Sequence, residues 1–192
     1  MANGNKIVLG SDEINRAIMR MAHEILERNK TIDRLALMGI RTGGAVLAKR
    51  FQDKLNELTH LEIPLGLLDI TLYRDDLSEV GPQPDVKETK IDFDVTDKII
   101  ILMDDVLFTG RTIRCALDAI IDYGRPECIQ LAVLIDRGHR ELPIKPDYVG
   151  KNIPTSKTEE VRVRFSETDG EDAVLVVPKE ESRMDGTNAG KG

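Results

Sequence analysis

Two adjacent carboxylates, Asp104 and Asp105, end an apolar run and come directly before a Thr-Gly-Arg-Thr turn. Ionised carboxylates accept hydrogen bonds from groups such as sugar hydroxyls, whereas the main-chain amides that begin a helix attract phosphate. Acids at a strand end are often merely solvated, and such a turn can be an ordinary helix start. Together and in register, the two features suit a ligand with hydroxyls on one side and a phosphate on the other, which describes a phosphoribosyl group.

The sequence around these residues predicts a strand, a turn and a helix. The run 99–103 is apolar on both faces, as is typical of a strand buried in a parallel sheet. Beyond the turn, Gly124 stands where a helix C-cap is expected. Apolar residues recur at helical spacing before it, namely Ile113, Ala116, Leu117, Ile120 and Ile121. In such units ligands bind at the carboxyl end of the strand, where the two acids lie.

A second strand, turn and helix precede this unit. Residues 35–40 predict a buried strand, Arg41-Thr42-Gly43-Gly44 a turn, and residues 47–55 a helix. An N-terminal helix capped by Ser11 has a buried stripe of Ile14, Ile18, Met21 and Ile25. We therefore expect an α/β fold, with a mainly parallel twisted sheet and helices on both faces.

The remaining segments complete this predicted fold. Residues 65–73 and 129–135 read as further strands, and 161–165 with 173–177 as a terminal hairpin. The charged stretch 74–92 contains Gly81, Pro82 and Pro84 and predicts a lid or a disordered loop. We expect one domain over residues 1–178 and a disordered tail over 179–192.

Composition narrows the class of protein. The chain has 192 residues, of which 41% are hydrophobic and 32% charged, and a net charge of −7. It has no run long enough to span a membrane and no signal-peptide pattern, so we expect a cytoplasmic protein. We expect both cysteines, Cys115 and Cys128, to be buried free thiols. The negative charge argues against bulk binding to nucleic acid but permits a local basic patch.

One candidate patch combines a helix face with a later segment. Helical periodicity places Arg16, Arg20 and His23 on one face of the N-terminal helix. A second basic group follows the strand at 129–135 and comprises Arg137, Arg140, Lys145, Lys151 and Lys157. If the fold brings the two groups together, they could track RNA phosphates. The alternative is that they are ordinary solvated charges.

Four stretches in order resemble one family. They are DITLYRDDL (69–77), ILMDDVLFTGRT (101–112), QLAVLIDRGHRELPI (130–144) and YVGKNIPTSKTE (148–159). The span from about residue 6 to 177 resembles the bifunctional pyrimidine-operon attenuation regulators that are also uracil phosphoribosyltransferases. The resemblance implies a type I phosphoribosyltransferase fold with a small hood and a terminal hairpin. It also implies that uracil and phosphoribosyl pyrophosphate give UMP and pyrophosphate, and that leader mRNA is bound when a uridine nucleotide such as UMP or UTP is present.

The resemblance also implies roles for residues. Asp104 and Asp105 would bind the ribose hydroxyls and act as the catalytic carboxylates, and Mg²⁺ would be carried mainly by the pyrophosphate, with no ligand assigned to the protein. The substrate-binding set would comprise Arg41, Thr42, Gly43, Tyr73, Arg74, Val106, Leu107, Phe108, Thr109, Gly110, Arg111, Thr112, Arg137 and Val161. The RNA-binding set would comprise Arg16, Arg20, His23, Arg140, Lys145 and Lys151. A homodimer or a higher homo-oligomer is expected.

Two positions depart from the family pattern. Many members have arginine where this chain has Gly43, and attenuation regulators often have a small hydroxyl residue where it has Met19. Two alternatives therefore stay open, an RNA regulator with weak catalysis and a phosphoribosyltransferase for a purine base. His139 could act as a general base or only as a surface contact.

Overall fold

The computed structural model describes residues 6–73 and 88–179 of the chain. Its centre is a five-stranded sheet in the order β3-β2-β4-β5-β6. All four pairings in this sheet are parallel. The strands are β2 (Leu35–Ile40), β3 (Leu65–Leu68), β4 (Ile99–Leu107), β5 (Cys128–Asp136) and β6 (Tyr148–Asn152). The predicted parallel sheet is confirmed.

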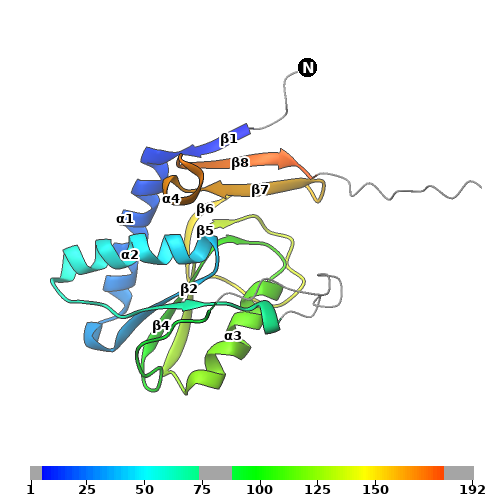
Figure 1. Cartoon of the computed structure of the whole chain (residues 1–192). Helices are drawn as coiled ribbons and strands as arrows, with labels where there is room; N and C mark the ends of the chain where they lie inside the picture. Colours follow the sequence, from blue (N-terminus) through cyan, green and yellow to red (C-terminus); the bar gives the residue numbers. More distant parts are fainter. Residues whose placement is uncertain (1–5, 74–87, 180–192) are drawn as a thin grey trace, which may run out of the picture.

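Helices cover both faces of this sheet (Figure 1). Helices α1 (Ser11–Arg28) and α2 (Gly43–Thr59) pack on one face, and α3 (Arg111–Tyr123) packs on the other. Strand β4 serves both cores by alternation, because successive side chains of a strand point to opposite faces. Ile101 and Met103 join the core under α1 and α2, whereas Ile100 and Leu102 join the core under α3. The prediction of helices on both faces is therefore confirmed.

A second, antiparallel sheet of three strands has the order β1-β8-β7. Its strands are β1 (Lys6–Gly10), β7 (Glu159–Arg164) and β8 (Ala173–Pro178), with the short helix α4 (Ser166–Asp169) between the last two. Figure 1 shows this sheet above the parallel one, and β7 contacts β4 where they meet. The terminal hairpin is confirmed. The pairing of β1 with it was not predicted, because a five-residue strand with an exposed Ile7 shows little periodicity.

One arginine joins the second sheet to the body of the molecule. Arg50 of α2 donates from Nη2 to Asp172 at 2.7 Å and also pairs with Glu167. Its guanidinium lies 4.9 Å from the centre of the Phe165 ring. These hydrogen bonds and charges lower the pKa of Asp172 and of Glu167 and raise the pKa of Arg50. The cluster thus fixes the β7–β8 connection against α2.

Three predictions about local structure were wrong. The strand predicted over 65–73 ends at Leu68, because Asp69 Oδ1 accepts the amide of Thr71 at 2.8 Å and turns the chain into a 3₁₀ helix, η2 (Thr71–Tyr73). Gly10, rather than Ser11, caps α1, and its amide donates to the Glu13 carboxylate at 3.0 Å. Cys128 is exposed because it opens β5 at the amino edge of the sheet; only Cys115 is buried.

The predicted lid over 74–92 lies largely outside the described residues, as does the predicted tail except for Lys179. A second 3₁₀ helix, η1 (Ile32–Arg34), leads into β2. Among residues 6–73 and 88–179, no helix is long and apolar enough to cross a membrane.

Candidate active site

Asp104 and Asp105 lie near the end of β4, at the carboxyl edge of the sheet. Asp104 is 7% exposed, and its Oδ1 accepts the amide of Asp105 at 3.0 Å. Asp105 Oδ1 accepts the amide of Val106 at 2.9 Å. Burial, and then the neighbouring Asp105, raise the pKa of Asp104 well above its usual range; burial also raises the pKa of Asp105. The pair is therefore held ready to interact with hydroxyls or positive charge.

The segment predicted to hold the phosphate, residues 106–112, which we call the phosphate loop, runs from the end of β4 into the first turn of α3. Gly110 is the N-cap of α3 and has a φ of 94°, a conformation that other residues rarely adopt. The first amides of a helix have no partner within that helix, and the helix dipole is positive there. Arg111 and Thr112 are exposed at this helix start. The loop can therefore hold a phosphate directly beside the carboxylates.

The turn between β2 and α2 comes against the same carboxylates. A Cβ on Gly43 would lie 2.2 Å from Asp105 Oδ2, and one on Gly44 would lie 2.4 Å from the Met103 carbonyl oxygen. Gly44 is thus required by its close approach to the β4 backbone, whereas a side chain at Gly43 would displace the Asp105 side chain. Arg41 and Thr42 are joined by a cis peptide bond, and Arg41 Nε is buried without a hydrogen-bond partner among the described residues. A buried donor of this kind suits an anionic ligand.

Arg137 lies behind the phosphate loop. It is 5% exposed, and its Nη2 donates to the Glu159 carbonyl at 2.6 Å. Its guanidinium lies 4.1 Å from the centre of the Phe108 ring, and burial lowers its pKa. Val161, two residues beyond Glu159, is buried in β7. Arg137 and Val161 therefore lie where the second sheet meets the loop, and the Arg137 side chain is already bonded within the protein.

Other predicted residues are placed as follows. The Tyr73 hydroxyl donates to Asp122 Oδ2 of α3 at 2.7 Å, so it points at that helix. Arg74 lies outside the described residues. His139 Nε2 lies 2.5 Å from the Thr155 carbonyl oxygen and must carry the hydrogen, because a carbonyl only accepts. The sequence did not predict this contact with Thr155, because no local pattern marks it.

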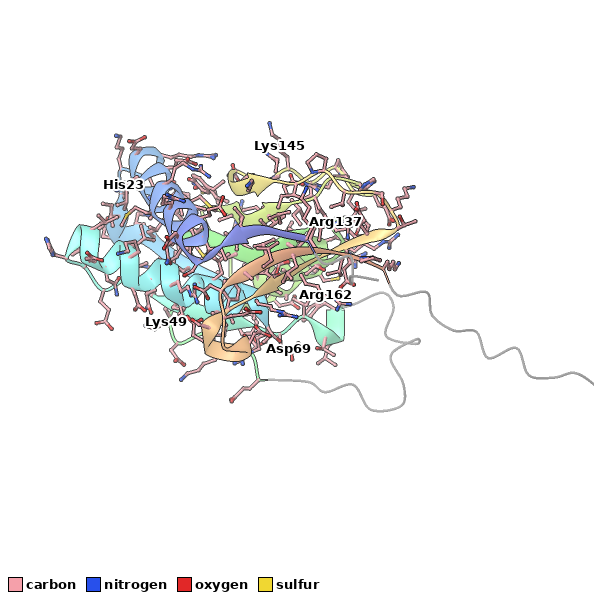
Figure 2. All side chains as sticks on the ribbon, turned by 90° about the horizontal axis from the view of Figure 1, so that it is seen from above. His23, Lys49, Asp69, Arg137, Lys145 and Arg162 are labelled. Carbon is pink, nitrogen blue, oxygen red and sulfur yellow. The ribbon has the colours of Figure 1, made fainter. Side chains whose placement is uncertain are left out.

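Part of the predicted RNA-binding set is brought together. Arg20 Nη2 donates to the Val149 and Gly150 carbonyls at 2.8 and 2.7 Å, so the basic face of α1 lies beside β6, which carries Lys151. Arg16, His23, Lys145 and Lys151 are exposed. Figure 2 shows His23 and Lys145 along one edge of the molecule, with Lys49 and Asp69 toward the opposite edge. Arg140 differs, because its guanidinium is bonded to the phosphate loop and to Asp136.

Comparison with known proteins identifies the class. A family model described as "Phosphoribosyl transferase domain" matches residues 8–168. A solved hypoxanthine phosphoribosyltransferase of Trypanosoma cruzi superposes with a TM-score of 0.69 at 19% identity, covering 91% of this chain and 97% of that one. A hypoxanthine-guanine phosphoribosyltransferase of Bacillus anthracis gives 0.68 at 15% identity, with 90% and 97% covered. The fold is that of a type I phosphoribosyltransferase.

Closer relatives narrow this class. A Deinococcus radiodurans protein named "Bifunctional protein PyrR" is 61% identical over 174 residues, which are 91% of this chain and 95% of the relative. A Thermus aquaticus protein of the same name is 57% identical, with 90% and 96% covered. The chain therefore belongs to the PyrR family of phosphoribosyltransferases.

Proposed function

We propose that this enzyme transfers the phosphoribosyl group to uracil, and that uridine nucleotide bound in the same site promotes binding of pyrimidine-operon leader mRNA. The observation that carries the catalytic half is the buried pair Asp104–Asp105, set between the phosphate loop and the Arg41–Gly44 turn. The names of the relatives support the two-fold role.

In the proposed reaction the ribose anomeric carbon loses its bond to pyrophosphate and gains one to uracil N1, which gives up its proton. Positive charge develops on the sugar, and Asp104 and Asp105 are placed to stabilise it while accepting hydrogen bonds from the ribose hydroxyls. The amides of the phosphate loop hold the 5′-phosphate. Arg41 Nε supplies a buried donor for the departing pyrophosphate.

The residues fit Mg²⁺ carried by the substrate. Among the described residues there is no group of three or more His, Cys, Asp or Glu side chains that could hold a metal ion. Mg²⁺ commonly uses one or two carboxylates together with substrate phosphates. Asp104 and Asp105 would bind the ribose hydroxyls, and the ion, carried mainly by the pyrophosphate, would neutralise its charge.

The deciding assay is UMP formation from uracil, phosphoribosyl pyrophosphate and Mg²⁺, with hypoxanthine and guanine tested in parallel. Product from uracil alone supports the proposal, and Asp105→Asn is expected to abolish it. Turnover of a purine would show a different base specificity. Loss of all three products would favour an RNA regulator with vestigial catalysis.

RNA binding is proposed to use the exposed basic residues on α1, β6 and the 137–145 segment. With few aromatic residues (4%), arginine and lysine must provide most contacts to RNA phosphates and bases. The probe is RNA transcribed from upstream of the pyrimidine genes in the source genome, titrated with and without UMP. Stronger RNA binding with UMP supports the proposal. Asp105→Asn should bind the RNA as the unaltered protein does without UMP, and should lose the gain from UMP only because it no longer binds the nucleotide. No binding to this RNA refutes the regulatory half.

We also propose that the protein is a cytoplasmic homodimer or higher homo-oligomer. Light scattering of the purified full chain gives the mass against 21.5 kDa for one chain. A monomer at micromolar concentration would refute this part.

A further inference from the structure

The segment 137–145, which we call the bridge segment, is hydrogen-bonded to the back of the phosphate loop. The Thr109 carbonyl accepts the amides of Glu141 and Leu142 at 3.0 and 3.2 Å. The Phe108 carbonyl accepts Arg140 Nη1 at 2.8 Å. A trans peptide group is planar, with its N–H opposite its C=O. Since the carbonyls of 108 and 109 point to the bridge segment, the amides of Thr109 and Gly110 point away from it and can face a phosphate.

All three nitrogens of the Arg140 guanidinium donate hydrogen bonds within the protein. Its Nη2 donates to Asp136 Oδ2 at 2.5 Å and its Nε to the Ile144 carbonyl at 3.0 Å, in addition to the bond from Nη1 to Phe108. Its side chain is 22% exposed. Arg140 therefore ties the end of β5, the phosphate loop and the distal half of the bridge segment together, and the exposed Lys145 comes directly after Ile144.

We propose that Arg140 is a positioning residue that transmits occupancy of the phosphate loop to the basic surface, and that it is not a contact to RNA phosphate. This inference rests on the proposed function and concerns how that function is regulated. A bound 5′-phosphate fixes the orientation of the loop peptides, and the same orientation presents their carbonyls to Arg140 and the amides of 141–142. Bound nucleotide thereby favours the bridge segment in this hydrogen-bonded, docked position, which fixes where Lys145 lies. Coupling of this kind is reciprocal, so RNA must tighten nucleotide binding equally.

The sharpest variant is Arg140→Lys. Lysine keeps the charge that a phosphate contact needs, but a single ammonium cannot bridge three acceptors in the fixed geometry of a guanidinium. The affinity of the leader RNA is measured with and without saturating UMP at several salt concentrations, in Arg140→Lys, Arg140→Gln and the exposed control Arg162→Lys. In the unaltered protein we expect UMP to strengthen RNA binding by roughly 5- to 150-fold. Both Arg140 variants should reduce this gain to less than about twofold while leaving the RNA affinity and the salt slope measured without UMP unchanged.

Lys145→Gln provides the contrasting behaviour of a direct contact. It should lower the salt slope by about 1 and weaken RNA binding even without UMP, and more strongly with UMP, because the docked bridge segment then holds Lys145 in place. If Arg140→Gln behaves in this way, or if Arg140→Lys retains the full gain from UMP, the proposal is overturned. Arg162→Lys should match the unaltered protein in both measurements.

A second readout needs no RNA and so separates this inference from the proposed function. Hydrogen exchange at the Glu141 and Leu142 amides should slow several-fold when UMP binds, and this slowing should be lost in Arg140→Lys even when UMP saturates the variant. Unchanged exchange in the unaltered protein would overturn the linkage, whatever the RNA result. Failure of RNA binding with slowed exchange would refute the regulatory function alone.

Discussion

Replacing Gly43 by alanine tests how closely the Arg41–Gly44 turn and the carboxylate of Asp105 depend on each other. The new Cβ would lie 2.2 Å from Asp105 Oδ2 and 2.5 Å from its Cγ, far inside van der Waals contact. The backbone of residue 43 begins α2 and does not have the left-handed φ that would favour glycine, so alanine fits the helix. The strain therefore falls on the Asp105 side chain, which must rotate.

The cost of that rotation can be worked out from its contacts. Turning Asp105 gives up the hydrogen bond from the Val106 amide, which is 2.9 Å long. A lost hydrogen bond costs about 1 kcal/mol, and an unfavourable rotamer costs about 0.5–1.5 kcal/mol more. About 2 kcal/mol lost from transition-state binding corresponds to a roughly 30-fold lower rate. Alanine is the better helix former by about 1 kcal/mol, which offsets about half of this cost and leaves a net loss of stability of about 1 kcal/mol.

The assay is steady-state UMP formation with phosphoribosyl pyrophosphate varied, together with a thermal melt of the same sample. We expect kcat/KM for phosphoribosyl pyrophosphate to fall roughly 30-fold and the Tm to fall by only about 2–4 °C. Gly10→Ala is the control for kcat/KM, since a Cβ there meets nothing within 4 Å, although its Tm should fall because alanine is a poorer helix N-cap than glycine. If Gly43→Ala keeps kcat/KM within threefold of the unaltered protein, or loses activity only because it melts, then Asp105 does not depend on this contact as reasoned.

Three further outcomes are expected from charged groups. Arg50→Met should lower the free energy of unfolding by about 2–3 kcal/mol at pH 7 in a urea titration, because it leaves the half-buried Asp172 without its ion-pair partner. Lys49→Ala, which breaks an exposed ion pair, should lower it by about 0.5 kcal/mol or less. Arg50 lowers the folded-state pKa of Asp172 and Glu167, so its contribution to stability is present above their unfolded pKa values near 4 and is lost as the pH falls through the folded values. The difference in unfolding free energy between Arg50→Met and the unaltered protein should therefore disappear below about pH 4. A difference that stays constant with pH would contradict this. Because burial raises its pKa, Asp104 destabilises the ligand-free protein at neutral pH. Asp104→Asn should therefore raise the Tm without ligand by about 2–4 °C and abolish UMP formation. A lower Tm would contradict this reasoning.

Those parts of the fold that local patterns encode were predictable from the sequence. Strand β2 was expected over the residues it occupies, and the alternation along β4 and the spacing along α3 indicated two cores on two faces. Strands β1 and β6 were missed because each has five residues and is stabilised by partners far away in the sequence. Asp69 ended β3 early through a side-chain hydrogen bond, which overrode the apolar pattern that continued past it.

The candidate site shows the same division. The residue types of the phosphate loop were visible in the sequence, and so was the Arg41–Gly44 turn. The contact between Gly43 and Asp105 was not, because it exists only where β2 and β4 pair in parallel with Gly39 opposite Met103. Similarly, Arg140 looked like one basic residue among several, although its hydrogen bonds lead inward to Phe108 and Asp136.

These nonlocal contacts explain why an absent side chain at residue 43 need not mean a weakened enzyme. An arginine at that position would require Asp105 to leave its present place, since even a Cβ cannot be accommodated. Glycine instead lets the backbone of the turn approach the carboxylate directly, while Arg41 keeps a buried donor free for an anion. Relative to the arginine that the family resemblance leads us to expect at this position, Gly43 exchanges one guanidinium for closer packing between the Arg41–Gly44 turn and Asp105. The kcat/KM values of Gly43→Ala and Gly43→Arg, measured side by side, test this exchange. If Gly43→Arg is more active than Gly43→Ala, the missing charge matters more for catalysis than the packing.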